Sequence, residues 1–316
     1  MARLRRSQPG GPGFGRVKSG KGFRYTGDPS AVDRDRIDAL VIPPAWTDVW
    51  ISPHENGHIQ ATGVDAAGRT QYLYHERWRR QKDTLKFRRM LQLAEALPGA
   101  RGTVTRDLRG DDQHRQVLAA AFRMLDAGAL RIGSERYADD NGSHGLSTLL
   151  CSHVAVQGDV ITLGFPAKSG KTWSSRLSDG DLAPLLKRLA KRGPTARLLA
   201  WEDEDGEWHP LAASEINDYV RERTGGAFTA KDFRTLRGTA AAAVSLAKHG
   251  PATTRTAVRR ALAQAMRDAS VVLGNTPTIA KASYVDPRVV ALFKKGRTVD
   301  AQRSGSIESE LRALLD

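Results

Sequence analysis

The spacing of the apolar residues changes along this chain, and that change restricts its fold more than any other feature of the sequence. In two regions, about residues 49–74 and 153–176, apolar and polar side chains alternate as they do in half-buried strands. Elsewhere the apolar residues recur every three or four positions, which is the spacing of amphipathic helices. We therefore predict an α+β fold with a small N-terminal β-sheet domain and a larger, mainly α-helical domain that carries a three-stranded β-meander.

The first β-rich region predicts a small sheet of short strands. The Asn-Gly pair at 56–57 is typical of a two-residue hairpin turn, and residues 58–62 form the expected return strand. In the strand that follows, alternation places Tyr72 and Tyr74 on one face and Gln71 on the other. The second β-rich region contains Gly-Asp and Ser-Gly turn pairs, which together predict the meander.

Helical spacing begins at Arg77, in a basic run where residues 77–89 contain seven Lys or Arg and one Asp. The last of the long helical patterns ends at the Gly-Asn-Thr-Pro sequence of residues 274–277. Helices are expected at about residues 86–96, 112–127, 181–191, 213–222, 231–248 and 254–273, with short helical pieces near 284 and from 287.

The charge of the chain indicates its partner. It has 49 Lys and Arg against 35 Asp and Glu, a net charge of +14, which favours a polyanion. Nucleic acid is the leading partner, and an acidic membrane surface is the alternative. No apolar run approaches the ~20 residues that a membrane span needs, and no apolar stretch follows the N-terminal arginines as it would in a signal peptide. With Cys151 as the single cysteine, the composition excludes membrane, secreted and fibrous classes.

Two kinds of site are excluded by residue spacing. The eight His and one Cys show no HxxxH or CxxC pattern, so we expect no metal site. Residues 164–172 resemble a phosphate-binding loop, but five residues separate its glycines instead of four and it lies in the β-meander, so we expect no ATP site. Phosphate recognition by Arg, Lys and Tyr remains, since a guanidinium can donate two parallel hydrogen bonds to two oxygens. Composition alone does not choose among the arginines.

Five motifs stand in a fixed order along the rest of the chain. They are ALRIGSERY at 129–137 with NGSHGLS at 141–147, FPAKSGK at 165–171, KDFRT at 231–235, Asn275, and SYV at 283–285. This order and spacing resemble the type IB DNA topoisomerases, especially the short bacterial enzymes similar to those of poxviruses. The stretches IPPAW at 42–46 and QYLY at 71–74 are part of the resemblance, which covers about residues 30–295.

The resemblance implies a mechanism and its catalytic residues. Tyr284 would attack a backbone phosphodiester of duplex DNA, form a 3′-phosphotyrosine and release a 5′-hydroxyl end that rotates and then attacks back. Arg131 and Arg234 would supply positive charge around the phosphate, and Lys168 would act as general acid. Asn275, where many relatives carry His, would donate a neutral hydrogen bond. Supercoils would relax with no cofactor, neither ATP nor an obligatory metal.

The resemblance and the basic patches also imply residues that contact DNA. These are Gln71, Tyr72, Tyr74, Arg77, Arg79, Arg80, Lys171 and Lys231. Lys171 flanks the same turn as Lys168 and is the alternative general acid. We divide the chain into a flexible basic arm at 1–28, an N-terminal DNA-clamping α+β domain at 29–85, a catalytic domain at 86–297 and a C-terminal tail at 298–316.

We expect a monomer that closes around duplex DNA as a clamp, in the cytoplasm at the bacterial nucleoid, with no membrane and no obligate protein partner. Two alternatives stay open. A tyrosine recombinase resembles the chain at the same five positions, but recombinases usually carry His three residues before the second arginine, where this chain has Lys231. A non-catalytic DNA-packaging protein would account for the charge but not for the ordered motifs.

Overall fold

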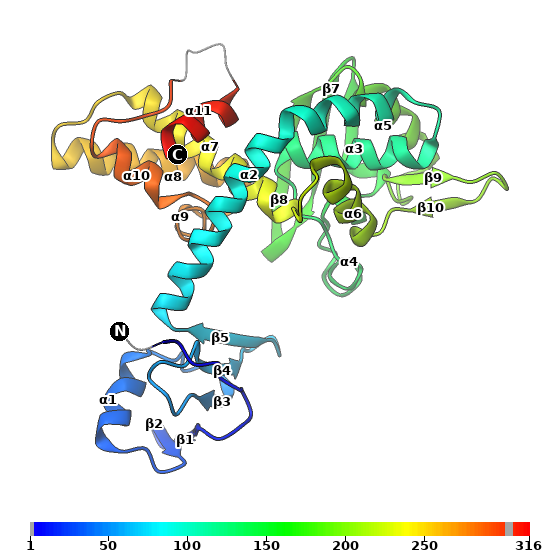
Figure 1. The fold of residues 1–316 in the computed structure, drawn as a ribbon. Helices are drawn as coiled ribbons and strands as arrows, with labels where there is room; N and C mark the ends of the chain where they lie inside the picture. Colours follow the sequence, from blue (N-terminus) through cyan, green and yellow to red (C-terminus); the bar gives the residue numbers. More distant parts are fainter. Residues whose placement is uncertain (1–2, 301–305) are drawn as a thin grey trace. The chain divides into compact units, whose positions relative to one another are not determined.

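The computed structural model describes residues 3–300 and 306–316, which divide into two compact units, Met1–Lys86 and Phe87–Asp316. Each unit has its own cluster of buried apolar residues, and Figure 1 shows the elements of both. The first unit contains an antiparallel sheet, and the second is mainly helical with a three-stranded sheet, so the predicted α+β fold class is confirmed. Across the described residues, no helix combines the length and apolar character needed to cross a membrane.

The first unit is a five-stranded antiparallel sheet in the order β2-β1-β3-β4-β5, with one helix before β3. Ile37 of the helix packs with Val49, Ile51 and Ala61 of the sheet to form its core. The elements are β1 (Phe14–Ser19), β2 (Gly22–Thr26), α1 (Ala31–Ala39), β3 (Thr47–Ile51), β4 (Ile59–Val64) and β5 (Thr70–Tyr74).

The prediction of a flexible arm over residues 1–28 is wrong for the two strands that it contains. Strand β1 pairs with both β2 and β3, and the buried guanidinium of Arg16 donates to the carbonyl oxygen of Ile42 at 2.8 Å. Some of the glycines that suggested flexibility instead permit close packing. A β-carbon on Gly13 would lie 2.6 Å from Nε1 of Trp50, so that position has room only for hydrogen.

The connection between β3 and β4 is longer than the predicted two-residue hairpin turn. Strand β3 ends at Ile51 and β4 begins at Ile59. The intervening loop binds the N-terminal segment, because Arg5 donates its N–H to the carbonyl of Asn56 and accepts from the N–H of His58, both at 2.9 Å. The loop therefore pairs with another segment instead of closing a tight turn.

The second unit consists of helices arranged around the predicted meander, in which β6, β7 and β8 pair in sequence order. A short two-stranded hairpin, which the sequence analysis did not predict, follows helix α5. The helices are α2 (Glu76–Arg109, which begins in the first unit), α3 (Gln113–Gly128), α4 (Glu135–Asn141), α5 (Leu182–Leu189), α6 (Ala213–Thr224), α7 (Ala230–His249), α8 (Arg255–Leu273), α9 (Pro277–Ser283), α10 (Pro287–Phe293) and α11 (Ile307–Leu315). The strands are β6 (Val154–Gln157), β7 (Val160–Ala167), β8 (Lys171–Ser178), β9 (Ala200–Glu202) and β10 (Trp208–Pro210).

Helix α2 is much longer than the helix predicted at 86–96. It continues past Pro98 because its apolar face does not end there: Leu93, Leu97 and Val104 are all fully buried. Proline removes one backbone donor from a helix interior, yet packing on both sides of it preserves the helix here.

The prediction of a C-terminal tail outside the catalytic domain is also wrong for residues 307–315. These residues form helix α11, which buries Leu311. Glu308 on this helix, with 4% of its side chain exposed, forms ion pairs with Arg101 of α2 and Arg237 of α7. Both arginines also bind Asp126 of α3, at 2.7 and 2.6 Å. This Arg101–Asp126–Arg237–Glu308 cluster joins four helices through buried charges.

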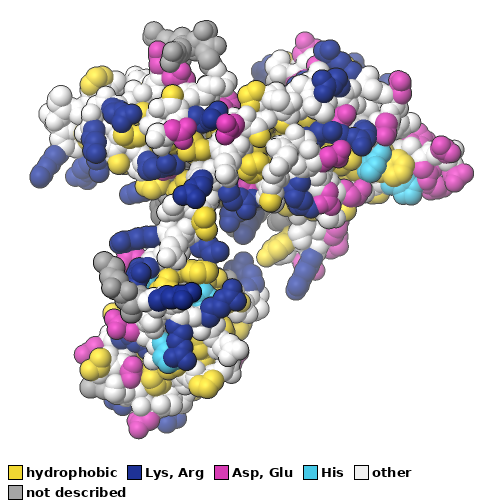
Figure 2. Space-filling view, viewed as in Figure 1, with side chains coloured by type: hydrophobic (Ala, Val, Ile, Leu, Met, Phe, Trp, Pro, Cys, Tyr) yellow, Lys and Arg dark blue, Asp and Glu magenta, His cyan; other side chains and the backbone are white. Residues whose placement is uncertain are grey.

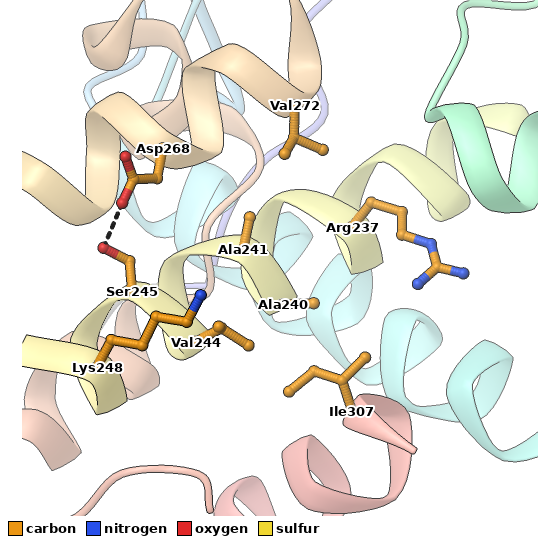
Figure 3. A pocket seen from close by; sticks show the side chains of 9 residues that line it. All are labelled: Arg237, Ala240, Ala241, Val244, Ser245, Lys248, Asp268, Val272 and Ile307. Atoms are coloured by element: carbon orange, nitrogen blue, oxygen red, sulfur yellow. Dashed lines mark hydrogen bonds between the residues drawn. The ribbon is translucent and has the colours of Figure 1, made fainter. Parts of the chain in front are cut away.

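The convergence of α7, α8 and α11 leaves a groove of about 410 Å³, shown in Figure 3. Ser245 of α7 donates to Asp268 of α8 at 2.6 Å on one side, and Ile307 of α11 lies on the other. Helix α7 therefore packs mainly against α8 and also contacts α11, and these contacts fix the helix that carries the second predicted arginine.

Replacing Glu308 by Gln should lower the free energy of unfolding by about 3 kcal/mol near pH 7, because it removes one partner from a buried ion pair. Burial raises the pKa of Glu308, but the hydrogen bond and charge of Arg101, with the charge of Arg237, outweigh it and hold this pKa below its usual value. A depressed carboxyl pKa stabilises the folded state above the unfolded-state pKa of about 4.3, and that contribution is lost as the pH falls.

Urea unfolding of the wild type and the Glu308→Gln variant at pH 7 and near pH 4 checks this. The stability difference should shrink at the lower pH. Glu95→Gln is the matched control, because Glu95 is exposed and pairs with Arg312 at the surface, where the expected effect is below about 1 kcal/mol. Equal losses of unfolding free energy in both variants would show that the buried cluster stabilises the fold no more than a surface ion pair does.

Candidate active site

Arg234 is the most buried of the predicted catalytic residues, with 2% of its surface exposed. It lies in the first turns of α7, whose N-terminus is capped by Asp232. The guanidinium donates to the carbonyl oxygens of Ala129, at the end of α3, and Leu273, at the end of α8, the latter at 2.8 Å. Carbonyls at helix C-termini lack partners within their own helix, so Arg234 satisfies two of them.

Tyr284 ends helix α9 and is fixed by α7. Its carbonyl oxygen accepts a hydrogen bond of 2.9 Å from the buried hydroxyl of Thr239. A β-carbon on Gly238 would lie 3.2 Å from the β-carbon of Tyr284 and 2.7 Å from a methyl carbon of Leu273. Glycine at this position of α7 therefore lets Tyr284 approach closely, and the guanidinium carbon of Arg234 lies 5.0 Å from the centre of its ring.

The charges near the phenol favour its ionised form. Burial by itself raises the pKa of Tyr284, but the charge and hydrogen bond of Arg234, followed by the charges of Arg131 and Lys231, outweigh burial and lower this pKa. The pKa of Arg131 is itself lowered, first by burial and then by the neighbouring charge of Arg234. These four side chains therefore form one electrostatic group.

Arg131 lies in a loop between α3 and α4 whose backbone is held in place. The N–H of Leu146 donates to the carbonyl oxygen of Arg131 at 2.8 Å, and the N–H of Ser147 donates to that of Ile132 at 2.7 Å. The two halves of the first predicted motif therefore pair with each other, which explains why both belong to it.

Asn275 follows the C-terminus of α8. The backbone N–H groups of Gly274 and Asn275 both donate to Ser270, so the backbone caps the helix and the Asn275 side chain does not. Both polar atoms of that side chain are buried without a hydrogen-bond partner in the described parts of the chain. Asn275 lines a pocket of about 230 Å³ together with Lys171 and Thr172 of β8.

The two predicted lysines of the hairpin lie in different surroundings. Lys168 is exposed in a short 3₁₀ turn, Lys168–Gly170, at the end of the β7–β8 hairpin. Within residues 3–300 and 306–316 it forms no hydrogen bond or ion pair with the other four predicted catalytic residues. Lys171 begins β8 and shares the pocket of Asn275. The structure thus groups Arg131, Arg234 and Tyr284, and it groups Asn275 with Lys171.

The predicted DNA contacts of the first unit include a pair of exposed aromatic rings. Tyr72 and Tyr74 of β5 are 45% and 39% exposed, and their rings stack with centroids 5.9 Å apart. Gln71 is turned to Asp65, to which it donates at 2.9 Å. Among the predicted arginines, Arg79 and Arg80 are exposed and Arg77 is half-buried. Figure 2 shows Lys and Arg distributed over the visible face of both units, while acidic side chains gather at the end of the β9–β10 hairpin.

The sequence analysis missed three residues that position the site. Thr239 and Gly238 fix Tyr284 from α7, and Trp173 of β8 contacts Gly274. A glycine inside an otherwise helical pattern was the available signal for close packing at 238. The other two look like ordinary core residues in sequence.

Comparison with known proteins identifies the family of this chain. Residues 75–304 match the family model for the eukaryotic DNA topoisomerase I catalytic core, and residues 22–65 match that for the bacterial DNA topoisomerase IB N-terminal domain. The chain is 31% identical to DNA topoisomerase 1B of Acanthamoeba polyphaga mimivirus over 294 residues, which cover 89% of this chain and 88% of that protein. It is 23% identical over 207 residues to DNA topoisomerase 1 of Mycosarcoma maydis, covering 60% of this chain and 19% of that protein.

The chain therefore belongs to the type IB DNA topoisomerase family. It is an isomerase that changes the topology of DNA, and duplex DNA is its substrate. The recombinase and DNA-packaging alternatives are set aside by this membership.

The lowered pKa of Tyr284 gives a direct test of the electrostatic group. In protein labelled with ¹³C-tyrosine, the Tyr284 resonance should titrate below the usual value of 10.0. Arg131→Ala should move the midpoint upward, since it removes one of the charges that favour the phenolate. Tyr284→Phe assigns the resonance. A midpoint that Arg131→Ala leaves in place would contradict the grouping.

Proposed function

We propose that this enzyme relaxes supercoiled duplex DNA by cleaving one strand through a 3′-phosphotyrosine on Tyr284 and resealing it, with neither ATP nor an obligatory metal. The observation that carries the proposal is the position of the Arg234 guanidinium 5.0 Å from the centre of the Tyr284 ring, in surroundings that lower the phenol pKa. An ordinary tyrosine with a pKa near 10 is a weak nucleophile at neutral pH, and positive charge beside it favours the phenolate.

The reaction proceeds by attack of the Tyr284 phenolate oxygen on the scissile phosphorus. The bond from phosphorus to tyrosine forms as the bond to the 5′-oxygen breaks, and the 5′-oxygen takes up a proton. Arg131 and Arg234 stabilise the negative charge that grows on the phosphate. One such donor lowers the activation barrier by roughly 3–4 kcal/mol. The phosphotyrosine keeps an ester bond in place of the broken one, so resealing by the 5′-hydroxyl needs no outside energy.

The leaving 5′-alkoxide needs a proton, which we assign to Lys168 at the exposed hairpin turn, with Lys171 as the alternative. Asn275 donates its amide N–H to a non-bridging phosphate oxygen. The buried, unpartnered amide of Asn275 supports this role, because a buried polar group without a partner is costly unless a ligand satisfies it.

Both units contact the duplex in this proposal, and the enzyme acts as a monomer that closes on DNA. The stacked rings of Tyr72 and Tyr74 suit contact with base edges or sugars, and the exposed Arg79 and Arg80 suit phosphates. Because phosphate contacts carry no base information, the expected sequence preference is modest.

Tyr284→Phe should bind DNA as the wild type does and form no covalent complex, because the change removes only the attacking oxygen. Plasmid relaxation with EDTA and without ATP should proceed in the wild type and be lost in the variant. Denaturing gels of enzyme mixed with end-labelled duplex detect the covalent species. A covalent band that persists in Tyr284→Phe would overturn the assignment of the nucleophile, and a wild type that needs ATP or a divalent metal would overturn the mechanism.

Lys168→Ala should slow cleavage of ordinary DNA by about 100-fold or more, the usual contribution of a general acid. DNA with sulfur at the 5′-bridging position should be cleaved at nearly the wild-type rate, because a thiolate leaves without a proton. Lys171→Ala is the matched variant from the other side of the turn. If it shows the substrate-dependent loss and Lys168→Ala does not, then Lys171 is the acid.

A further inference from the structure

The lysine hairpin, formed by β7 and β8 with Lys168 and Lys171 at its end, makes a close contact with the turn that carries Asn275. Trp173 on β8 is 6% exposed, and its six-membered ring lies against Gly274, the residue before Asn275. A β-carbon on Gly274 would lie 2.4 Å from that ring, and the backbone of Gly274 has φ +56°, a conformation that favours glycine. The sequence therefore provides a flat surface on one side of the contact and a residue without a side chain on the other.

The Trp173 side chain is fixed from the hairpin side. It lies opposite Phe165 in the β7–β8 pairing, and the two rings stack with centroids 6.2 Å apart and an angle of 19° between their planes. Its indole N–H donates to the hydroxyl of Ser175 at 3.0 Å. An aromatic ring held by stacking, a hydrogen bond and burial keeps one orientation. Trp173 can therefore fix the position of the hairpin relative to the turn at Gly274.

The contact lies beside residues to which the proposed function gives catalytic roles. The pocket of about 230 Å³ beside Trp173 is lined by Lys171 and by Asn275, whose amide atoms are buried and unpartnered. Lys168 precedes Trp173 by five residues and is exposed at the hairpin turn. Lys168 therefore lies beyond the buried side chain of Trp173, at the exposed end of the hairpin.

We propose that Trp173 is a positioning residue: its indole, seated on Gly274, fixes the lysine hairpin and the Asn275 turn as one unit, so that the acid and the amide reach the same phosphate together. This proposal rests on the proposed function. A proton donor must come within about 3 Å of the leaving oxygen, and a displacement of about 1 Å can cost on the order of 100-fold in rate. Without the seat, the hairpin end would sample many positions and seldom deliver its proton.

The test compares single-turnover cleavage of ordinary and 5′-sulfur DNA by Trp173→Ala. Cleavage of ordinary DNA should slow by about 100-fold, because the lysine is misplaced. Cleavage of the sulfur substrate should slow much less, since it needs no acid. The remaining loss in rate would come from displacement of Asn275. Asn275→Ala serves as the reference for that second loss, and it should slow both substrates equally.

Trp208→Ala is the matched control, because this tryptophan lies on the other hairpin, is 38% exposed and packs under Arg192. It should cleave both substrates at the wild-type rate. Trp173→Ala must also be folded at the assay temperature, which its thermal unfolding curve shows. If it does not fold, Trp173→Phe, which keeps an aromatic ring but shortens it, replaces it in the same comparison.

Approaching the contact from Gly274 gives an independent variant. Gly274→Ala should slow cleavage of ordinary DNA more than cleavage of 5′-sulfur DNA. The added methyl group would displace the indole and with it the hairpin. Adding Trp173→Phe to Gly274→Ala should restore part of the lost rate, since the shorter ring leaves space for the methyl group. A merely structural role predicts that Gly274→Ala slows cleavage of both substrates equally.

Equal slowing of the two substrates by Trp173→Ala, or no slowing, would overturn the inference while the proposed function stands. A wild type that forms no covalent complex with either substrate would instead overturn the proposed function. The two failures are therefore distinguishable in one set of reactions.

Discussion

The buried guanidinium of Arg234 is the interaction on which the candidate site depends. It donates to two backbone carbonyls, at the ends of α3 and α8, and it faces the ring of Tyr284. Arg131 follows the first of these helix ends and Asn275 the second, so one side chain sets the starting points of both loops. Three segments far apart in the sequence are thereby fixed to the first turns of α7, and the electrostatic group is assembled as a consequence of helix packing.

A second arginine on the same helix face extends this arrangement. Arg237, three residues after Arg234, binds Asp126 near the end of α3 and Glu308 on α11. Two arginines of α7 therefore hold residues at or near the ends of α3, α8 and α11. Arg234 binds carbonyl oxygens, and Arg237 binds carboxylates. The difference matters for the chemistry, because a carboxylate neutralises a guanidinium and a carbonyl oxygen leaves it its full charge.

Periodicity predicted the fold class, the meander and the long helices of the second unit, because each depends on local spacing. It failed for β1, β2 and α11. Strand β2 pairs with its sequence neighbour β1, but β1 also pairs with β3, and the ion-pair partners of α11 are distant in sequence. Arg16 is held by carbonyls 26 residues away, and Glu308 pairs with an arginine 207 residues away. Gly13, just before the first strand, indicates mobility in a sequence, whereas in the fold it allows Trp50 to pack.

The candidate site was predicted through motif order, and the roles of its residues stay predictions. The structure groups Arg131, Arg234, Lys231 and Tyr284, which spacing alone could not do, and it adds Thr239, Gly238 and Trp173. Local spacing gives no signal for Thr239 and Trp173, because each acts on a residue from another segment, whereas Gly238 stands out as a glycine inside a helical pattern. The choice between Lys168 and Lys171 depends on where a proton is delivered, and both lie within one turn.

The pairing of Arg234 with carbonyl oxygens has a consequence for the enzyme without DNA. Arg131 and Arg234 are partly and almost fully buried, respectively, and burial followed by the neighbouring charge of Arg234 lowers the pKa of Arg131. Like charges held together in a buried place cost folding free energy, so the unoccupied site is a weak point of the second unit. A phosphate group relieves that repulsion, so occupancy and stability are linked. We therefore expect DNA bound at this site to raise the resistance of the enzyme to heat and proteases.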